Sequence, residues 1–127
     1  MAERLLIDTD VLIEYLRGRE KGLEYLEDLD ADLSISVISV AELFSGVKGD
    51  EEKRVLQQFL LAFTVLPVTE RVARTGGFYR REYRPSHGTG LADALIAATA
   101  EELGLSLVTF NRRHFPMVSE IVTPYDR

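Results

Sequence analysis

The fold is decided near the start of the chain by the stretch Leu5-Leu6-Ile7-Asp8-Thr9-Asp10-Val11-Leu12-Ile13. Its first part is an unbroken apolar run, which predicts a short buried strand over residues 4–7. Its second part has the apolar spacing of a helix, which we expect to run from Thr9 to Arg17. Asp8 falls where the strand meets the helix, and a carboxylate removed from water there is costly unless its charge is compensated.

Working outward from this stretch, strands and helices alternate along the whole chain. We expect helices over about 20–29, 39–46, 51–63, 70–83 (ending at Pro85) and 91–103 (closed by Gly104), strands over 33–38, 65–68, 106–109 and 120–122, and a loop over 86–90. This alternation predicts an α/β sandwich with a mainly parallel sheet. In such folds ligands bind outside the carboxyl ends of the strands.

Length and composition bound the class of protein. With 127 residues, 46% hydrophobic and 28% charged, we expect one globular domain of ordinary soluble character. The chain has no cysteine, which excludes disulfides, zinc–thiolate sites and thiol catalysis and suits a reducing cytoplasm. We expect no signal peptide and no membrane segment, because no apolar run approaches the ~20 residues that a span requires.

The charge balance is acidic, with 21 acidic against 15 basic residues and a formal net charge of −6. Domains that bind nucleic acid are usually basic, so the sum taken alone argues against such a partner. That argument is weak, because acidic residues committed to a metal site count toward the total and yet attract phosphate once the cation is bound.

Three carboxylates lie where an apolar segment meets a turn or a helix. Asp8 follows the first predicted strand, Glu42 comes shortly after the second, and Asp93 interrupts the otherwise apolar residues 91–98. Asn111 follows the strand that we expect to end near Thr109. Because the carboxyl ends of parallel strands share one edge, these residues should meet there, and a divalent metal ion is the simplest common compensator.

Each acid also has a purely structural alternative. Asp8 or Thr9 could cap the first helix. Ser39 and Glu42 have the spacing of a capping box, in which the glutamate reaches back to the amide of the cap residue. Asp93 would gain ~0.3–1 kcal/mol from the dipole of its helix, which is little for so apolar a setting.

Four blocks of sequence carry a further signal. They are Leu-Leu-Ile-Asp-Thr-Asp-Val-Leu-Ile at 5–13, Ser-Val-Ala-Glu-Leu-Phe-Ser-Gly at 39–46, Leu-Ala-Asp-Ala-Leu-Ile-Ala-Ala-Thr-Ala at 91–100 and Leu-Val-Thr-Phe-Asn-Arg-Arg-His-Phe at 107–115. In this order and spacing they make the chain resemble a PIN-domain protein of the VapC toxin type. The resemblance implies a single three-layer α/β/α domain over residues 1–127, with a central, mainly parallel sheet of four to five strands.

The resemblance also implies an activity, that of a metal-dependent endoribonuclease acting as the toxin of a toxin–antitoxin pair. Asp8, Glu42 and Asp93 match the acidic catalytic and metal-binding positions of the family. Asn111 takes the fourth catalytic position, where other PIN domains carry Asp, and its neutral oxygen leaves a second metal position open. An oxygen-rich site without histidine suits Mg²⁺ or Mn²⁺.

Other positions are expected to support this site or its substrate. Thr9 and Thr109 match hydroxyl positions that support the acids, and Asp10 is assigned a supporting place beside them. Arg112 and Arg113 directly follow Asn111, which makes them candidates for contacts to the RNA backbone. A solvated turn is the alternative for the two arginines. His87, in the predicted loop before Asp93, is a weaker candidate for facing substrate.

The resemblance further implies partners. They are an RNA substrate, a small VapB-like antitoxin and a second copy of the chain in a homodimer, with higher assembly in the antitoxin complex, all in the cytoplasm and none at a membrane. The helix expected over 51–63 offers apolar residues on more than one face, which could serve a dimer, an antitoxin groove or the core. These residues are Val55, Leu56, Phe59, Leu60 and Phe63.

Three other functions stay in view. A phosphatase with an aspartyl nucleophile would also place acids at Asp8 and Asp10, but it needs a lysine and a later acidic pair, which residues 107–115 do not supply. A receiver domain would need an acidic acceptor in mid-chain and a late lysine, and both are missing. A PIN-like scaffold that binds RNA or protein without cutting is left open by Asn111.

Overall fold

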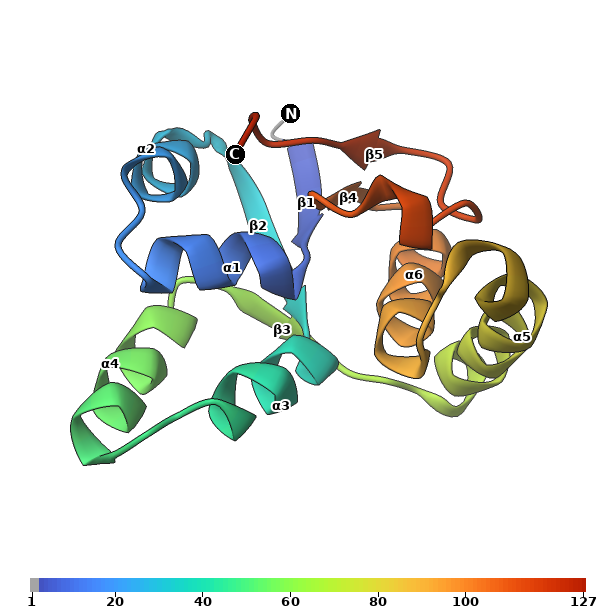
Figure 1. Ribbon diagram of the computed structural model, residues 1–127, viewed down its shortest axis with the longest axis horizontal. Helices are drawn as coiled ribbons and strands as arrows, with labels where there is room; N and C mark the ends of the chain where they lie inside the picture. Colours follow the sequence, from blue (N-terminus) through green and yellow to red (C-terminus); the bar gives the residue numbers. More distant parts are fainter. Residues whose placement is uncertain (1–2) are drawn as a thin grey trace.

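The structure is a computed structural model that describes residues 3–127. Within these residues one sheet forms from β1 (Glu3–Ile7), β2 (Ala31–Ser36), β3 (Thr64–Leu66), β4 (Ser106–Val108) and β5 (Ile121–Val122). The strand order is β3-β2-β1-β4-β5, and every neighbouring pair is parallel (Figure 1). The predicted parallel α/β sheet is therefore confirmed, with β1 as its central strand.

Helices cover both faces of this sheet. They are α1 (Thr9–Leu16), α2 (Glu20–Asp28), α3 (Val37–Ser45), α4 (Asp50–Leu60), α5 (Glu70–His87) and α6 (Leu91–Leu103), with a short 3₁₀ helix, η1 (Arg112–His114), after β4. In Figure 1, α1 to α4 lie to one side of β1 and α5 and α6 to the other. None of the helices among residues 3–127 combines the length and the apolar character that crossing a bilayer requires.

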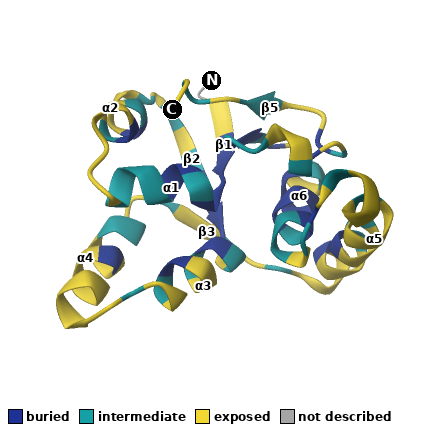
Figure 2. Ribbon diagram, viewed as in Figure 1, coloured by how far each residue is buried: buried dark blue, intermediate teal, exposed yellow. Residues whose placement is uncertain are grey.

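The two faces of β1 explain the three layers, because successive side chains of a strand point to opposite sides. Leu5 and Ile7 are buried in one apolar cluster with residues of α1 to α4. Leu6 is buried in a second cluster with α6 and the segment after β4. The second half of the central strand, from Leu5 to Ile7, and the inner side of α6 are the most continuously buried parts of the fold (Figure 2). The predicted three-layer α/β/α architecture is thus confirmed.

One predicted boundary is wrong in a way that matters for the site. We expected a strand over 33–38 and a helix from Ser39, but β2 ends at Ser36 and α3 begins at Val37. The Ser36 hydroxyl accepts a hydrogen bond from the Ile38 amide (3.0 Å), which satisfies a free N–H of the first turn. Local capping therefore outweighs the strand preference of Val37 and Ile38. The capping box of Ser39 and Glu42 is wrong for the same reason.

A second error concerns the end of α5. We expected Pro85 to end the helix and residues 86–90 to form a loop, but α5 continues to His87. Proline removes the N–H that would bond to the carbonyl of Arg81, and its ring crowds that carbonyl, but both residues are exposed near the end of the helix, where water can satisfy the freed carbonyl. The helix stops instead at Gly88, whose φ of 70° is left-handed and whose amide donates to Arg84 O (3.0 Å).

The remaining differences are small. α4 begins at Asp50 and ends at Leu60, where we expected 51–63, and the strands near residues 65 and 107 are shorter than predicted. Of the apolar residues assigned to the core by default, Leu56 is buried, and Phe59, Leu60 and Phe63 pack against the same cluster. Val55 differs, since 49% of its surface is exposed.

The pairing of α5 with α6 gives a direct test of this packing. A Cβ at Gly76 would lie 2.7 Å from Leu95 Cδ2 and 3.3 Å from Ala94 O, whereas a Cβ at Gly77 would meet nothing within 4 Å. We therefore expect Gly76→Ala to lower the free energy of unfolding by about 1–3 kcal/mol through overpacking. The matched Gly77→Ala should raise it by up to ~1 kcal/mol, because alanine favours the helix. Urea denaturation of both variants measures this, and equal stability would contradict the close α5–α6 contact.

Candidate active site

Asp8 stands at the carboxyl end of the central strand and is almost fully buried, at 5% exposure. One carboxylate oxygen accepts a hydrogen bond from the Thr9 amide (2.8 Å), so Asp8 does cap α1. The other oxygen accepts from the Thr109 hydroxyl (2.7 Å), which comes from the end of β4. A helix cap alone would sit at the surface, so the burial of this residue calls for a further explanation.

The pKa of Asp8 indicates that this buried carboxylate lacks a compensating positive charge. Burial is the main cause that raises the pKa of Asp8 from 3.8 to about 7. The charges of Asp10 and Asp93 raise the pKa further, whereas the hydrogen bonds from Thr109 and Thr9 lower it. The neighbouring acids that disfavour the charge of Asp8 would also attract a cation to this place.

Glu42 reaches the same edge of the sheet from α3. Its Oε1 accepts a hydrogen bond from the Thr9 hydroxyl (2.7 Å). The same hydroxyl lies 2.7 Å from the Oγ of Ser39, which is fully buried. Sequence reasoning did not assign Ser39 to the site. The spacing that suggested a capping box places Ser39 and Glu42 one turn apart on the same helix face, and that spacing was the signal for it.

Asp93 lies in the first turn of α6, where its Oδ2 is 3.3 Å from the Gly90 amide that it accepts from. The same oxygen is 3.1 Å from Nδ1 of His114. Asn111 approaches His114 as well, with 2.7 Å between its Nδ2 and the same ring nitrogen. His114 is therefore a second residue that sequence reasoning left out, although it stands three positions after Asn111.

Asp10 closes the site between α1 and the segment after β4. Its Oδ2 accepts from the Phe110 amide (3.1 Å) and lies 3.4 Å from the Thr109 hydroxyl. Its Oδ1 is buried and, among residues 3–127, has no hydrogen-bond partner. Burial is the first cause that raises the pKa of Asp10. An unpartnered carboxylate oxygen beside Asp8 adds to the local demand for a positive charge.

The remaining predicted residues divide between the site and the surface. Thr9 and Thr109 each donate to one of the acids, and the Asn111 amide donates to the Thr109 hydroxyl (3.0 Å). Arg112 and Arg113 lie exposed on η1, directly beyond Asn111. His87 lies in α5, not in a loop, and its Nδ1 contacts Ser86 Oγ (2.7 Å), so the structure does not bring it to the acids.

The donor atoms fit a hard divalent cation in kind. Asp8, Glu42 and Asp93 offer carboxylate oxygens and Asn111 an amide oxygen, which are the ligands that such ions prefer. In this conformation the residues described do not contain three His, Asp or Glu side chains drawn tightly around one point. Each acid is instead held by its own hydrogen bonds, to Thr109, Thr9 and Gly90 respectively.

Comparison with known proteins gives this arrangement a family. The sequence model of the PIN domain matches residues 5–120. This chain belongs to the PIN-domain family. It is 44% identical to a protein named ribonuclease VapC10 of Mycobacterium tuberculosis, over 95% of this chain and 92% of that protein. It is 39% identical to ribonuclease VapC19 of the same species, over 94% of this chain and 98% of that protein.

Solved structures agree. A chain from a toxin–antitoxin complex of Klebsiella pneumoniae superposes with a TM-score of 0.83 at 30% identity, covering 97% of this chain and 99% of that chain. PIN-domain membership decides against the aspartyl phosphatase and the receiver domain, whose later acids and lysine the sequence already lacked.

The raised pKa of Asp8 in this PIN domain predicts how stability depends on pH without metal. In the unfolded chain Asp8 titrates near 3.8, and in the folded protein near 7. The folded form thus binds the proton more tightly, so its contribution is fully present below about pH 4 and is lost as the pH rises to about 7. The expected loss is on the order of 4 kcal/mol.

Urea denaturation in the presence of a chelator measures this between about pH 4 and pH 8. The carboxamide variant Asp8→Asn keeps the size of the side chain and cannot ionise. The difference in free energy of unfolding between wild type and variant should therefore shift in favour of Asp8→Asn as the pH rises. A difference that stays constant with pH would mean that Asp8 does not carry the raised pKa.

Proposed function

We propose that this PIN domain is a metal-dependent endoribonuclease, the toxin of a toxin–antitoxin pair, which hydrolyses RNA phosphodiester bonds. The observation that carries the proposal is the buried carboxylate of Asp8 at the end of the central strand, with Asp10 and Asp93 close enough to raise its pKa. The relatives named as ribonucleases support the activity, and nothing in the site favours a scaffold that binds without cutting.

In this proposal Asp8, Asp93 and Glu42 hold the metal ion, with Asn111 as a fourth catalytic residue. PIN-domain ribonucleases generally depend on metal, and we propose Mg²⁺ or Mn²⁺ because the donors are oxygens. When bound, such an ion lowers the pKa of a coordinated water and offsets the negative charge that builds on the phosphate.

The chain's own residues prepare this site. The Thr109 hydroxyl fixes one oxygen of Asp8, and the Thr9 hydroxyl fixes one oxygen of Glu42, so both acids are oriented before substrate arrives. The backbone N–H of Asn111 donates to the Thr109 hydroxyl, and that hydroxyl donates to Asp8, so the segment after β4 is held at the end of β1. Arg112 and Arg113, exposed just beyond, are proposed to bind phosphates of the RNA backbone.

The nuclease proposal predicts a sharp effect of one carboxylate. Asp93→Asn keeps an oxygen that can accept from the Gly90 amide but removes the charge. We expect RNA cleavage with Mg²⁺ or Mn²⁺ to fall by at least ~10²-fold, because charge stabilisation at a metal site is a large part of such catalysis. The assay follows cleavage of structured RNAs on gels.

Asp30→Asn is the matched control, since Asp30 is exposed and precedes β2 at the opposite end of the sheet. It should cleave like wild type. If wild type does not cut RNA with either ion, or if Asp93→Asn cuts as well as wild type, the proposed nuclease site is wrong.

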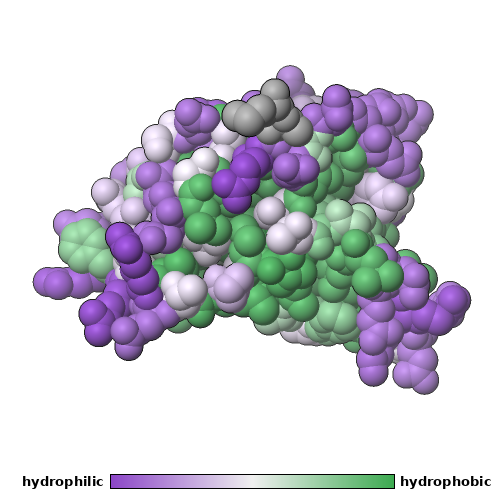
Figure 3. Space-filling view, turned by 180° about the vertical axis from the view of Figure 1, so that it is seen from behind, coloured by the Kyte–Doolittle hydropathy of each residue, from purple (hydrophilic) through white to green (hydrophobic). Residues whose placement is uncertain are grey.

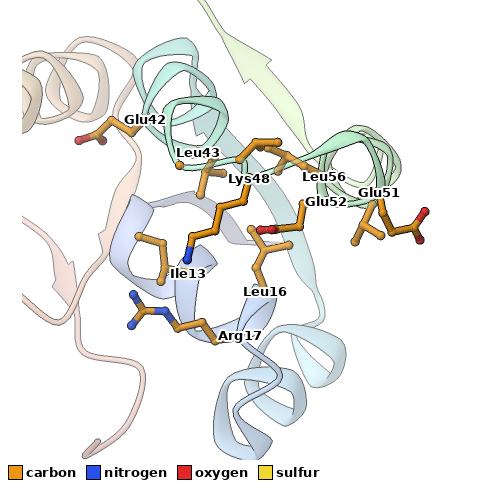
Figure 4. A pocket seen from close by; sticks show the side chains of 12 residues that line it. Ile13, Leu16, Arg17, Glu42, Leu43, Lys48, Glu51, Glu52 and Leu56 are labelled. Atoms are coloured by element: carbon orange, nitrogen blue, oxygen red, sulfur yellow. The ribbon is translucent and has the colours of Figure 1, made fainter.

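The proposed antitoxin has a place to bind. A groove of about 460 Å³ lies between α1, α3 and α4 (Figure 4). Lys48 and Glu52 reach into it, and Glu42 and Glu51 point away at its two ends. Its lining includes apolar residues of all three helices and of the loop between α3 and α4, which suits a segment of protein. These residues are Ile13, Leu16, Leu43, Val47, Val55 and Leu56. We propose that a segment of a small VapB-like antitoxin occupies this groove beside Glu42.

Val55 and Leu61 offer a matched pair for testing the groove. Val55 lines it with 49% exposure, and Leu61 lies outside it with 77% exposure. Val55→Glu should weaken co-purification with the product of the adjacent gene by at least ~10-fold, because it buries a charge in the contact. Leu61→Glu should not weaken it. Equal binding by both variants would place the partner elsewhere.

We also propose that the toxin is a homodimer, with further assembly in the antitoxin complex, and that it acts in the cytoplasm. Figure 3 shows apolar side chains gathered across the centre of the back of the molecule. Several large apolar residues are exposed, and gathered apolar surface of this kind is a common place for a second copy to bind. Among them are Val37, Val65, Phe78, Leu91 and Leu103.

A further inference from the structure

His114 has no part in the site as proposed above, yet the fold holds it beside two residues of that site, Asp93 and Asn111. Its amide donates to Asn111 O (3.0 Å), which forms the turn of η1. Its carbonyl oxygen accepts from the hydroxyl of Thr89 (2.8 Å), a residue that is fully buried. The backbone of His114 is therefore fixed from two sides, by the turn that follows β4 and by the loop before α6.

The ring is oriented by its surroundings as well. A Cβ built on Gly88 would lie 3.5 Å from Nε2, so this side of the ring packs against the loop at Gly88. The other ring nitrogen, Nδ1, faces the site. It lies 3.1 Å from Oδ2 of Asp93 and 2.7 Å from Nδ2 of Asn111. The side chains of His114 and Asp93 are 33% and 26% exposed, so a solvated ion can reach both.

These contacts conflict for a single ring nitrogen. If Nδ1 accepts a hydrogen bond from the Asn111 amide, its lone pair faces the carboxylate oxygen of Asp93, and two acceptors at 3.1 Å repel each other. If Nδ1 is protonated, it donates to Asp93, and Asn111 must present its amide oxygen instead. A cation bound to both Nδ1 and the carboxylate removes the repulsion between His114 and Asp93 without moving either of them, and Asn111 then turns its side-chain amide so that the oxygen faces the ion.

The separation itself fits that role. Two neighbouring ligands of an octahedral ion with bonds of about 2.1 Å are about 3.0 Å apart. Nδ1 of His114 and Oδ2 of Asp93 are 3.1 Å apart. The geometry points to His114 as a nitrogen ligand of the ion that Asp93 holds. This inference rests on the metal site of the proposed function and adds to it a residue outside the acidic set.

A nitrogen ligand from His114 would affect which metal ion the site prefers. Mg²⁺ prefers oxygen ligands, whereas imidazole suits the transition metals. An aspartate at position 111 would offer a fourth charged oxygen, but this chain has a neutral Asn111 with an imidazole beside it. The site should therefore favour Mn²⁺ over Mg²⁺.

The chain has only two histidines, His87 and His114, which makes a direct test possible with untagged, full-length protein. Pulsed electron paramagnetic resonance of bound Mn²⁺ detects an imidazole nitrogen attached to the ion. We expect that signal in wild type and in the control His87→Asn, and its loss in His114→Asn. The asparagine keeps a hydrogen-bonding amide near Asp93 and removes the ring nitrogen.

Calorimetric titration of the same proteins gives the second measurement. His114→Asn should lower Mn²⁺ affinity by at least ~10-fold and change Mg²⁺ affinity by less than ~3-fold. If His114 only orients Asp93, His114→Asn should keep the Mn²⁺ affinity of wild type, and wild type should show no nitrogen bound to the ion. That result would overturn the inference. Mn²⁺ that binds through Asp93 without a nitrogen signal overturns it too and leaves the proposed nuclease standing. If neither ion binds wild type, the metal-dependent nuclease itself fails.

Discussion

One buried carboxylate at the junction of β1 and α1 links the elements that form the candidate site. Asp8 starts the helix by accepting from the Thr9 amide, and it joins the two central strands by accepting from the Thr109 hydroxyl. Its two oxygens thus satisfy one local and one distant donor, 101 residues away along the chain. The hydrogen bonds do not fully offset the loss of water, since the pKa of Asp8 still lies near 7. The molecule is built around a charge that it leaves partly uncompensated.

Topology explains why this charge lies where ligands can reach it. Within the sheet, β2 pairs with one edge of β1 and β4 pairs with the other, so the strand order reverses at β1. Open parallel sheets bind their ligands at such a reversal, beyond the carboxyl ends of the strands. Asp8 follows β1, and Thr109 and Asn111 follow β4, so the strand ends alone bring them together. Asp93 reaches the same place because α6 begins there.

Much of this could be predicted from sequence, because periodicity and strand ends are local features. The run before Asp8 fixed the central strand, and Gly104 marked the end of α6 correctly. Ser36 was missed because a cap competes with the strand preference of the residues after it, and a pattern of apolar residues does not weigh the two. Pro85 was given too much weight, since its cost depends on which turn of the helix it occupies. Ser39 and His114 were missed because their contacts to Thr9 and Asp93 join distant elements.

Helix α3 contributes residues to both the proposed metal site and the proposed antitoxin groove, so a partner bound in the groove can affect the catalytic residues. Glu42 is held by Thr9 at the acidic edge, and the adjacent Leu43 lines the groove between α1, α3 and α4. Successive residues of a helix point about 100° apart, so one short helix can face both places. Thr9 belongs to α1, which forms another wall of the groove through Ile13 and Leu16. A partner in the groove therefore contacts the two helices whose hydrogen bond orients Glu42, and it needs no contact with the metal ligands at β1 and α6 to disturb that acid.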